Sequence, residues 1–435
     1  MPGSASSEVL TWDAVETEPR ERLHELQLER LRATVERSLE RQPPFASRLA
    51  EAGVTDAREI TSLGDVARLP FSRKSDLREN YPFGLLAVPR EELVRVHGSS
   101  GSHGKPTVVG YTRADLEAWT ELMARCMTMA GVRQGMVLHN ANGYGLFTGG
   151  LGFHYGGERI GATVIPVSGG FTARQAMLLS DLGGQALAAT PSYALVIAQA
   201  IRDAGLSPEE LQLEIGLFGG EPWTEEMRRE LDGALAIKAV NFYGLSEMCG
   251  PGVAAECLAA RDGLHVNEDH FLAEVIDPES GEPVPEGADG ELVFTTLAKE
   301  AQPLIRYRTG DIGSLTIEPC GCGRTLARIT ALRGRIDDML IVRGVNLFPS
   351  NVEALLLDVE EVAPHYRLIV DRAGGMDEVH VECEPADPGI DRSALGSRLE
   401  TLLRDHTGIR ITVTVVERGE VPRSEGKAVR VVDRR

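Results

Sequence analysis

The sequence predicts an α/β fold, with a large N-terminal domain of mostly parallel sheets and helices, a β-rich part, and a small α+β C-terminal domain. Its 435 residues are too many for one compact core, so two or three domains are expected. Short apolar strands alternate with helices as far as residue 250, which is typical of parallel sheets. Strand- and turn-rich sequence follows over 270–330, and the residues after 338 suffice for one small domain.

The elements follow, in chain order, from hydrophobic periodicity and turn residues. Residues 14–60 are rich in Glu, Arg and Leu at helical spacing and predict helices. The stretch 93–112 predicts two short strands around a glycine-rich loop, and 114–131 predicts a helix that ends at Gly131. The elements expected next are strands at 137–142 and 162–169 with a glycine-rich loop between them, helices at 173–184 and 193–206, and strands within 186–192, 215–222 and 237–247. Glycine turns end several of these strands, where active sites of such folds lie.

Composition and charge argue against several classes of function. A formal net charge of −20 makes a nucleic acid or an anionic membrane an unsuitable partner, because phosphate neutralisation needs clustered cations. The sequence has no apolar run of about 18 residues, so no membrane-spanning helix is expected. The N-terminal sequence lacks the pattern of a signal peptide. We therefore expect a cytoplasmic protein whose six cysteines are reduced, so that clustered cysteines are candidates for metal binding.

The loop HGSSGSHGKPT at 97–107 combines glycines, hydroxyl residues and a lysine. Such a loop can direct many backbone N–H groups and one ammonium at a small anion. It is not the phosphate loop of P-loop NTPases, which requires G-x-x-x-x-G-K-[ST] before a helix. Here Ser99 stands where the first glycine belongs, Pro106 follows the lysine, and a strand follows the loop. A flexible surface loop is the alternative, but it explains less well a position between two apolar strands.

Further motifs recur in a characteristic order along the chain. They are FGGEPW (218–223), NFYGLSE (241–247), YRTGD (307–311), GRIDDML (334–340) and PRSEGKAVRVVD (422–433). Together with the glycine loop they resemble the adenylate-forming superfamily, and in more detail the phenylacetate–coenzyme A ligase family. The resemblance covers nearly the whole chain. It implies that ATP activates an aromatic carboxylic acid to acyl-AMP, with release of pyrophosphate, and that coenzyme A then accepts the acyl group.

The resemblance assigns the glycine loop to the β- and γ-phosphates of ATP. The residues that would cradle these phosphates are Ser99, Ser100, Gly101, Ser102, His103 and Gly104, and Lys105 would add a positive charge. Relatives commonly carry two threonines where this chain has Ser102 and His103. The histidine at this position either donates to phosphate or alters the release of pyrophosphate.

The remaining ATP-binding residues are also implied by the resemblance. Glu247 matches the carboxylate that binds Mg²⁺, an ion that prefers oxygen ligands. Tyr243 would stack on adenine, Asp311 would accept both ribose hydroxyls, and Arg335 would hold the ribose or a phosphate. The other implied residues of the nucleotide site are Gly219, Glu221, Pro222, Asn241, Phe242, Gly244 and Ser246.

Two features of the C-terminal sequence complete the implied reaction cycle. Lys427 in SEGKA resembles the mobile catalytic lysine that contacts the carboxylate and the α-phosphate, a task that suits an ammonium on a flexible stem. Asp337 resembles the hinge about which the small domain turns after adenylation. The implied domains are 1–334, which includes a zinc-bearing β-rich part at about 255–330, the hinge 335–338, and 339–435.

A zinc site is expected in this β-rich part. Cys320 and Cys322 form a tight C-x-C, and Cys257 and His265 precede them. Three thiolates and one imidazole are a closed tetrahedral set, which is typical of structural zinc. Relatives often show a similar arrangement. Four unlinked residues in a reduced protein are the alternative, and Cys249 is a rival ligand whose place beside the nucleotide motif suits a substrate-lining role better.

The acyl pocket is expected around the motif NGYGLFTGG and the residues after it. Tyr144 and Phe147 offer aromatic edges that suit an aryl acid, and His154 follows them. Gly220 stands where relatives often have alanine, and Phe153 replaces a smaller residue. The substrate is therefore expected to be a phenylacetate-like acid, or a ring-substituted acid such as an amino- or hydroxybenzoate.

Two other interpretations stay open. In one, the enzyme passes the acyl group to a carrier protein or an amine, or activates another oxyanion, and thiol dependence separates this from a coenzyme A ligase. In the other, the chain is a non-catalytic nucleotide-binding or zinc-stabilised protein. The presence of Lys105, Glu247, Asp311, Arg335 and Lys427 argues against the second interpretation. The resemblance also suggests a homodimer.

Overall fold

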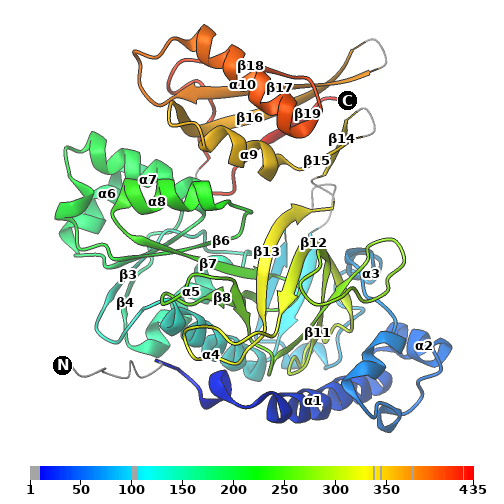
Figure 1. Cartoon of the computed structure of the whole chain (residues 1–435). Helices are drawn as coiled ribbons and strands as arrows, with labels where there is room; N and C mark the ends of the chain where they lie inside the picture. Colours follow the sequence, from blue (N-terminus) through cyan, green and yellow to red (C-terminus); the bar gives the residue numbers. More distant parts are fainter. Residues whose placement is uncertain (1–9, 100–105, 337–338, 343–344, 374–375, 425) are drawn as a thin grey trace, which may run out of the picture. The chain divides into compact units, whose positions relative to one another are not determined.

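The computed structural model of the protein describes residues 10–99, 106–336, 339–342, 345–373, 376–424 and 426–435. The chain divides into two compact units. Unit 1 comprises Met1–Ser168, Gln185–Ala188 and Val240–Leu332, and unit 2 comprises Gly169–Gly184, Ala189–Ala239 and Arg333–Arg435. Figure 1 shows the helices and strands of both units.

The structure contains ten labelled α-helices and nineteen labelled strands over the described residues. The α-helices are α1 (Arg20–Arg41), α2 (Pro43–Glu51), α3 (Lys74–Glu79), α4 (Arg113–Met129), α5 (Gly149–Ile160), α6 (Thr172–Asp181), α7 (Pro191–Asp203), α8 (Glu225–Leu235), α9 (Pro349–Leu357) and α10 (Arg392–Thr407). The strands are β1 (Arg95–Ser99), β2 (Thr107–Tyr111), β3 (Val137–Asn140), β4 (Thr163–Ile165), β5 (Ala186–Ala189), β6 (Ile215–Gly219), β7 (Lys238–Leu245), β8 (Gly250–Glu256), β9 (Leu264–Val266), β10 (Phe271–Ile276), β11 (Gly290–Thr296), β12 (Tyr307–Thr316), β13 (Arg328–Arg335), β14 (Leu340–Val342), β15 (Val345–Leu347), β16 (Val362–Ala373), β17 (Met376–Pro385), β18 (Ile411–Val415) and β19 (Val431–Asp433). Among the described residues, no helix combines the length and apolar character needed to cross a membrane.

The largest sheet contains eleven strands in the order β10-β11-β12-β13-β9-β8-β7-β6-β5-β3-β4. Strand β3 pairs in parallel with β4 and β5, and α5 provides the crossover that the parallel pair β3–β4 requires. The pairs β7–β8, β8–β9, β9–β13, β10–β11 and β11–β12 are antiparallel. The predicted α/β fold is confirmed, and the predicted β-rich part supplies antiparallel strands to this mixed sheet.

The two strands expected around the glycine loop form an antiparallel hairpin. Strand β1 pairs with β2 in a register that places Ser99 opposite Thr107. Ser99 is the last described residue before the loop, and residues 100–105 lie outside the described part of the chain. The hairpin therefore fixes where the predicted phosphate loop begins and ends.

Helix α5 corrects the expectation of a glycine-rich loop between β3 and β4. Its glycines allow close packing against α4, because a Cβ at Gly152 would lie 2.8 Å from the ring of Trp119, and one at Gly156 would lie 2.6 Å from the Cβ of Met123. Gly161 ends the helix in the left-handed conformation, with φ of 86°. The glycines that suggested a loop are thus the residues that let two helices approach each other.

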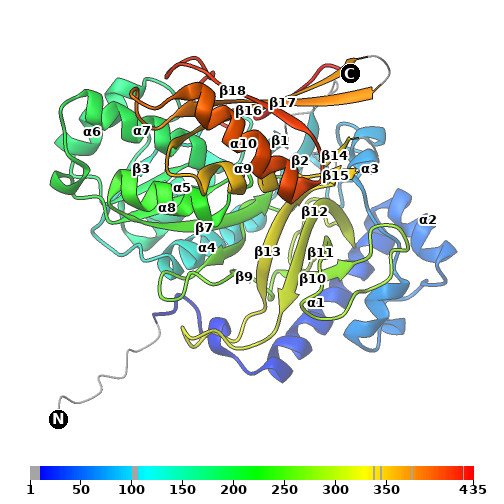
Figure 2. The ribbon, with the colours of Figure 1, turned by 45° about the horizontal axis from the view of Figure 1, so that its top comes forward.

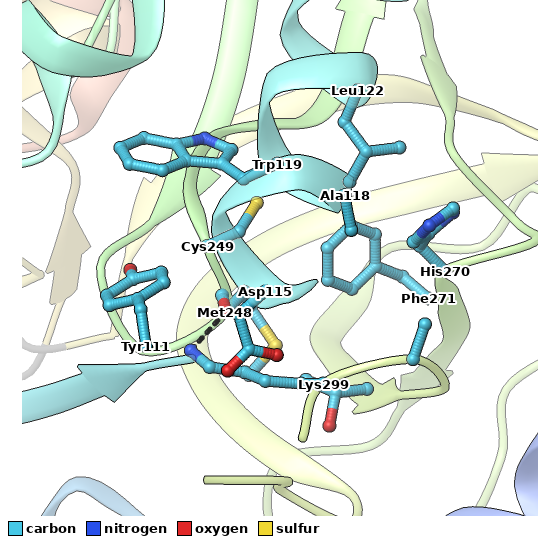
Figure 3. Close-up of a pocket in the computed structure, with 12 residues that line it drawn as sticks. Tyr111, Asp115, Ala118, Trp119, Leu122, Met248, Cys249, His270, Phe271 and Lys299 are labelled. Atoms are coloured by element: carbon cyan, nitrogen blue, oxygen red, sulfur yellow. Dashed lines mark hydrogen bonds between the residues drawn. The ribbon is translucent and has the colours of Figure 1, made fainter. Parts of the chain in front are cut away.

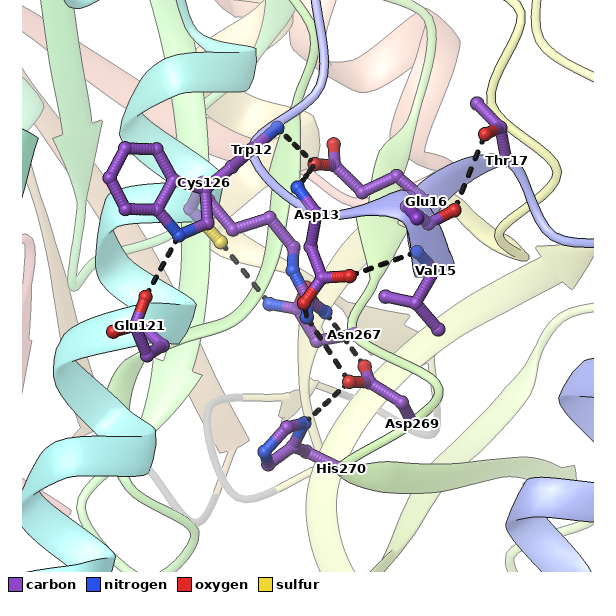
Figure 4. Close-up of polar contacts among 12 residues, drawn as sticks. Trp12, Asp13, Val15, Glu16, Thr17, Glu121, Cys126, Asn267, Asp269 and His270 are labelled. Atoms are coloured by element: carbon purple, nitrogen blue, oxygen red, sulfur yellow. Dashed lines mark hydrogen bonds and ion pairs between the residues drawn. The ribbon is translucent and has the colours of Figure 1, made fainter.

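A buried ion pair connects α4 to the segment that follows β9. The guanidinium of Arg125 donates to both carboxylate oxygens of Asp269, at 2.7 and 3.1 Å, and the two side chains are 3% and 5% exposed. Arg125 also donates to Asn267 at 3.0 Å and to Asp13 at 3.3 Å. Figure 4 shows Asp13, Asn267, Asp269 and His270 in this network. Burial opposes ionisation of Asp269, but the adjacent side chains of His270 and Arg125 hold the pKa of its carboxyl well below the usual range. This network attaches the N-terminal segment to the core of unit 1.

The C-terminal part of unit 2 has the predicted α+β architecture. Its four-stranded sheet has the order β18-β17-β16-β19, in which β16 is antiparallel to β17 and parallel to β19. Helices α9 and α10 contact this sheet (Figure 2). Apolar side chains of the helices and strands form one buried core. The same unit contains α6, α7 and α8, with α7 beside α8.

Candidate functional site

Glu247 lies in the turn between β7 and β8, and only 5% of the residue is exposed. Its Oε1 accepts a hydrogen bond from the Ser99 hydroxyl at 3.2 Å and lies 3.4 Å from the Thr107 hydroxyl. Ser99 and Thr107 also hydrogen-bond to each other and flank the glycine loop. Unit 1 thus brings the predicted magnesium ligand to the base of the predicted phosphate loop.

A buried lysine supports the backbone around Glu247. The ammonium of Lys299, three residues after β11, donates to the carbonyl oxygen of Met248 at 2.6 Å and to that of Glu247 at 3.3 Å. It also lies 4.6 Å from the centre of the Tyr111 ring. Burial lowers the pKa of Lys299 to about 8. The motifs did not reveal this residue, and its only signal in the sequence is that lysine is rare in the chain.

A small cavity borders Lys299 (Figure 3). Its volume of about 30 Å³ is of the order needed for one water molecule. The Tyr111 hydroxyl donates to the carbonyl of Ser246 at 3.3 Å, and Cys249 lines the same cavity. Burial raises the pKa of the Cys249 thiol well above its ordinary value, so this thiol is protonated and unreactive near neutral pH.

Tyr243 and Asp311 form the second polar contact of unit 1 that involves predicted ATP residues. The Tyr243 hydroxyl donates to Oδ2 of Asp311 at 2.6 Å, and Asp311 is 9% exposed. The tyrosine ring lies 5.9 Å from the ring of Phe294, in a tilted arrangement. The residue predicted to stack on adenine therefore contacts the residue predicted to hold the ribose.

Other predicted ATP residues on β7 have structural partners. The backbone N–H of Asn241 donates to Glu256 at 2.8 Å, whereas the Phe242 ring is buried and lies 5.2 Å from the ring of Phe153. Successive side chains of a strand point to opposite faces. If Asn241 and Tyr243 face a ligand, the side chain of Phe242 points away from it, and Phe242 can contact the ligand only through its backbone. A Cβ at Gly244 would lie 1.9 Å from a backbone oxygen of β8, so this glycine permits the close pairing of the two strands.

Unit 2 contains the predicted turn after β6 and the predicted catalytic lysine. Gly219 ends β6, and Gly220 has φ of 86°, in the region that favours glycine. A Cβ at Gly220 would lie 3.8 Å from Cε of Lys427. The Glu221 carboxylate accepts a hydrogen bond from the backbone N–H of Ala428 at 2.8 Å. These contacts, all within unit 2, bring Lys427 beside the turn that was predicted to bind ATP.

Pro222 and Arg335 complete the predicted nucleotide residues that the structure describes. Pro222 is exposed, and Arg335 is partly buried at the end of β13. The predicted residues that lie outside the described part of the chain are Ser100, Gly101, Ser102, His103, Gly104, Lys105 and Asp337. Their roles remain predictions from the sequence.

Two of the residues predicted for the acyl pocket contact each other in unit 1. The Tyr144 hydroxyl accepts a hydrogen bond from Asn140 at 2.8 Å and lies 3.1 Å from Nδ1 of His154. The Nε2 of His154 lies 3.1 Å from Glu158. Burial raises the pKa of Tyr144 to about 12. Phe147, also predicted for the pocket, is 52% exposed.

The four predicted zinc ligands converge in unit 1. One ligand atom from each of Cys257, His265, Cys320 and Cys322 lies within 4.8 Å of all the others. The four residues are between 0% and 9% exposed, and the thiols contribute to one small apolar cluster. Among the described residues, no other group of three or more such side chains fits a metal ion by this measure.

The distances within this cluster match a tetrahedral zinc site. With Zn–S of about 2.3 Å and Zn–N of about 2.1 Å, tetrahedral angles place two thiolates about 3.8 Å apart and a thiolate about 3.6 Å from an imidazole nitrogen. The Sγ atoms of Cys257 and Cys320 lie 3.8 Å apart, and Sγ of Cys322 lies 3.6 Å from Nε2 of His265. A hydrogen bond between two of the thiols lowers the pKa of Cys322 and raises that of Cys257. The residues present therefore fit zinc.

Comparisons with known proteins agree with this arrangement. A family model described as "AMP-binding enzyme" matches residues 15–297, and one described as "AMP-binding enzyme C-terminal domain" matches residues 344–435. A phenylacetate-coenzyme A ligase of Thermus thermophilus is 51% identical over an alignment of 439 positions, which covers 97% of this chain and 98% of that protein.

Solved structures are similar along the whole chain. 2-Hydroxyisobutyryl-CoA ligase in the postadenylation state with 2-HIB-AMP is 31% identical, with a TM-score of 0.91, and the match covers 97% of this chain and 91% of that chain. The same ligase with 2-HIB-AMP and CoA in the thioesterification state has a TM-score of 0.72 at 31% identity, covering 96% and 91%. The chain belongs to the AMP-binding enzymes and, within them, to the phenylacetate–coenzyme A ligase family.

Proposed function

We propose that this protein is an AMP-forming aryl-acid–coenzyme A ligase. ATP and an aromatic carboxylic acid give acyl-AMP and pyrophosphate, and coenzyme A then takes the acyl group to give an aryl-CoA thioester and AMP. The observation that carries the proposal is the position of Glu247, a buried carboxylate next to Ser99, where the glycine loop begins. The chain that places it there belongs to the AMP-binding enzymes. Phenylacetate–coenzyme A ligases 46% to 51% identical to the chain support the same reaction.

In the first step a carboxylate oxygen attacks the α-phosphate and the bond to pyrophosphate breaks. The barrier is the mutual repulsion of anions, so catalysis depends on positioning and on charge stabilisation. Glu247 would hold Mg²⁺, which neutralises phosphate charge when bound. Lys105 would stabilise the departing pyrophosphate, and Lys427 the charge that develops near the α-phosphate. Tyr243 and Asp311 would hold the adenosine through stacking and the ribose hydroxyls.

In the second step the thiolate of coenzyme A attacks the acyl carbonyl and AMP leaves. Lys427 is not needed for this second step, because the step breaks no phosphoanhydride bond. We propose that the small domain turns between the two steps and that Asp337 is the hinge of this movement, with domains 1–334 and 339–435 on either side. The family resemblance of GRIDDML supports this proposal, and substitution of Asp337 by proline is expected to impair thioester formation more than adenylation.

The acid itself is proposed to carry a polar ring substituent. The hydrogen-bonded pair of Tyr144 and His154 offers polar groups beside an aromatic edge. An amino- or hydroxybenzoate is therefore expected to be a better substrate than phenylacetate. Initial rates of pyrophosphate release across a panel of aryl acids test this, and a clear preference for phenylacetate would contradict it.

We further propose a structural zinc ion on Cys257, His265, Cys320 and Cys322, which their spacing supports. A homodimer in the cytoplasm remains the expectation from the sequence.

Pyrophosphate release measured with and without coenzyme A tests the overall reaction. AMP formation without a coenzyme A thioester would instead favour a carrier protein or an amine as the acceptor.

A further inference from the structure

The segment around Lys427 is held within unit 2 by contacts from two other parts of that unit. The Glu221 carboxylate accepts the backbone N–H of Ala428 at 2.8 Å, directly after the lysine. The Thr190 hydroxyl donates to the carbonyl of Gly426 at 2.9 Å, directly before it. The residues on both sides of Lys427 are therefore each fixed by a side chain far away in the sequence.

The sequence explains why both side chains point to this segment. Thr190 is the N-cap of α7, and its hydroxyl accepts from the backbone N–H of Tyr193 at 3.4 Å while donating to Gly426. Ser192, in the first turn of the same helix, donates to Oε1 of Glu221 through its backbone N–H at 2.7 Å and its hydroxyl at 2.5 Å. The other oxygen of Glu221 is thereby directed at Ala428.

Further contacts extend this arrangement along the C-terminal segment. The Ser424 hydroxyl donates to the carbonyl of Lys427 at 2.7 Å. Arg430 donates to the Ser192 hydroxyl at 3.0 Å and pairs with Glu353 at 2.6 Å, where the two side chains are 15% and 3% exposed. The segment therefore has defined partners before, at and after the lysine.

We propose that Glu221 is a positioning residue for adenylation, which holds the lysine-bearing segment so that Lys427 lies beside the turn after β6. This proposal rests on the proposed function, because it concerns the step that uses Lys427. The Glu221 carboxylate acts through the backbone of Ala428, and its two oxygens accept hydrogen bonds from Ser192 and from Ala428. Thr190 assists through Gly426.

The two half-reactions should then respond differently to loss of this contact. Adenylation needs the lysine in place, whereas attack of the thiol on a preformed acyl-AMP breaks no phosphoanhydride bond. In Glu221→Gln one acceptor oxygen becomes an amide group that cannot accept a hydrogen bond. We expect adenylation, measured as aryl-acid-dependent pyrophosphate release, to slow by about tenfold or more, the equivalent of at least ~1.4 kcal/mol. Thioester formation from synthetic aryl-AMP should stay within about twofold.

A kinetic split and a mutant cycle separate positioning from nucleotide binding. Slowing should appear in kcat of adenylation, with KM for ATP nearly unchanged. In a Lys427→Ala background, Glu221→Gln should add almost nothing, because the lysine it positions is absent. Additive effects, or a loss expressed mainly in KM for ATP, would overturn the proposal. Glu225→Gln is the matched control, since that carboxylate lies four residues away and is 72% exposed.

Hydrogen exchange tests the contact without depending on activity. The amide of Ala428 should exchange faster in Glu221→Gln than in the wild-type protein or in Glu225→Gln, whereas the unfolding midpoint should change little. Unchanged exchange in this segment would refute the contact. If the wild-type protein forms no acyl-AMP with any acid, the proposed function fails and so does the role of Glu221 in adenylation. Faster exchange would then show that the contact itself exists. Thr190→Val should show the same selective slowing, and Thr190→Ser, which keeps the hydroxyl, should restore the rate.

Discussion

Removal of zinc offers a quantitative test of the Cys257, His265, Cys320 and Cys322 cluster. Four ligand atoms within 4.8 Å of one another can hold a single ion, so one zinc per chain is expected. An ion that binds only the folded chain raises the free energy of unfolding by RT ln(1 + [Zn]/Kd). Above Kd, each tenfold increase in free zinc should therefore add about 1.4 kcal/mol. Urea unfolding of the full chain in zinc-buffered solutions measures this slope directly.

The variants decide whether this cluster is the source of the slope. Cys322→Ser removes one thiolate, and the variant should lose the bound zinc and most of the dependence on free zinc. Cys383→Ser is the control, because this cysteine is also buried but lies outside the cluster. Only the dependence of its unfolding free energy on free zinc is compared with that of the wild-type protein, so the absolute stability of the control does not enter. A wild-type free energy of unfolding that does not change with free zinc would refute the assignment.

Three further predictions concern unit 1. Asp269→Asn removes the buried counter-ion of Arg125, leaving only the half-exposed Asp13, and should lower the free energy of unfolding by about 3–5 kcal/mol in urea titrations. Lys299 has a folded-state pKa of about 8, below its ordinary 10.5, because burial disfavours its charged form. The loss of folding stability from burying this charge is therefore full below pH 8 and vanishes above pH 10.5. Wild-type stability should therefore rise relative to Lys299→Met by about 2 kcal/mol between pH 7 and 9.5. Tyr243→Phe removes a 2.6 Å hydrogen bond to Asp311, and KM for ATP should rise by about tenfold.

Each of these predictions has a matched control and a contradicting result. Asp262→Asn, whose carboxylate is 75% exposed, should cost less than about 1 kcal/mol. A similar small loss for Asp269→Asn would contradict the buried-pair account. Lys238 is exposed, and Lys238→Met should show no comparable pH dependence. An unchanged KM for ATP in Tyr243→Phe would remove that contact from nucleotide binding.

Sequence patterns predicted those features that depend on local spacing. The hairpin around the glycine loop follows from two short apolar strands, and the convergence of Cys257, His265, Cys320 and Cys322 follows from a C-x-C and two upstream candidate ligands. Motif resemblance also selected Glu247, which the structure places beside Ser99. In each case an unusual combination of residue types indicated residues that the structure brings together.

Features that depend on packing between distant segments escaped prediction. Helix α5 was expected to be a loop because glycine is a poor helix former, and only the close approach of α4 explains glycine at Gly156. Lys299 and Glu221 act on backbone groups about 50 and 200 residues away in the sequence, which no local periodicity encodes. Tertiary contacts, and not propensity, decide these positions.

Transfer of a carboxylate oxygen tests the central claim, formation of an acyl-adenylate, most directly. The aryl acid is labelled with oxygen-18 in its carboxylate and incubated with the protein, ATP, Mg²⁺ and coenzyme A. Because the attacking oxygen stays on phosphorus when the thiol displaces AMP, mass spectrometry should find one labelled oxygen in AMP and the other in the aryl-CoA thioester. Unlabelled AMP, or ADP as the nucleotide product, would contradict the proposed reaction.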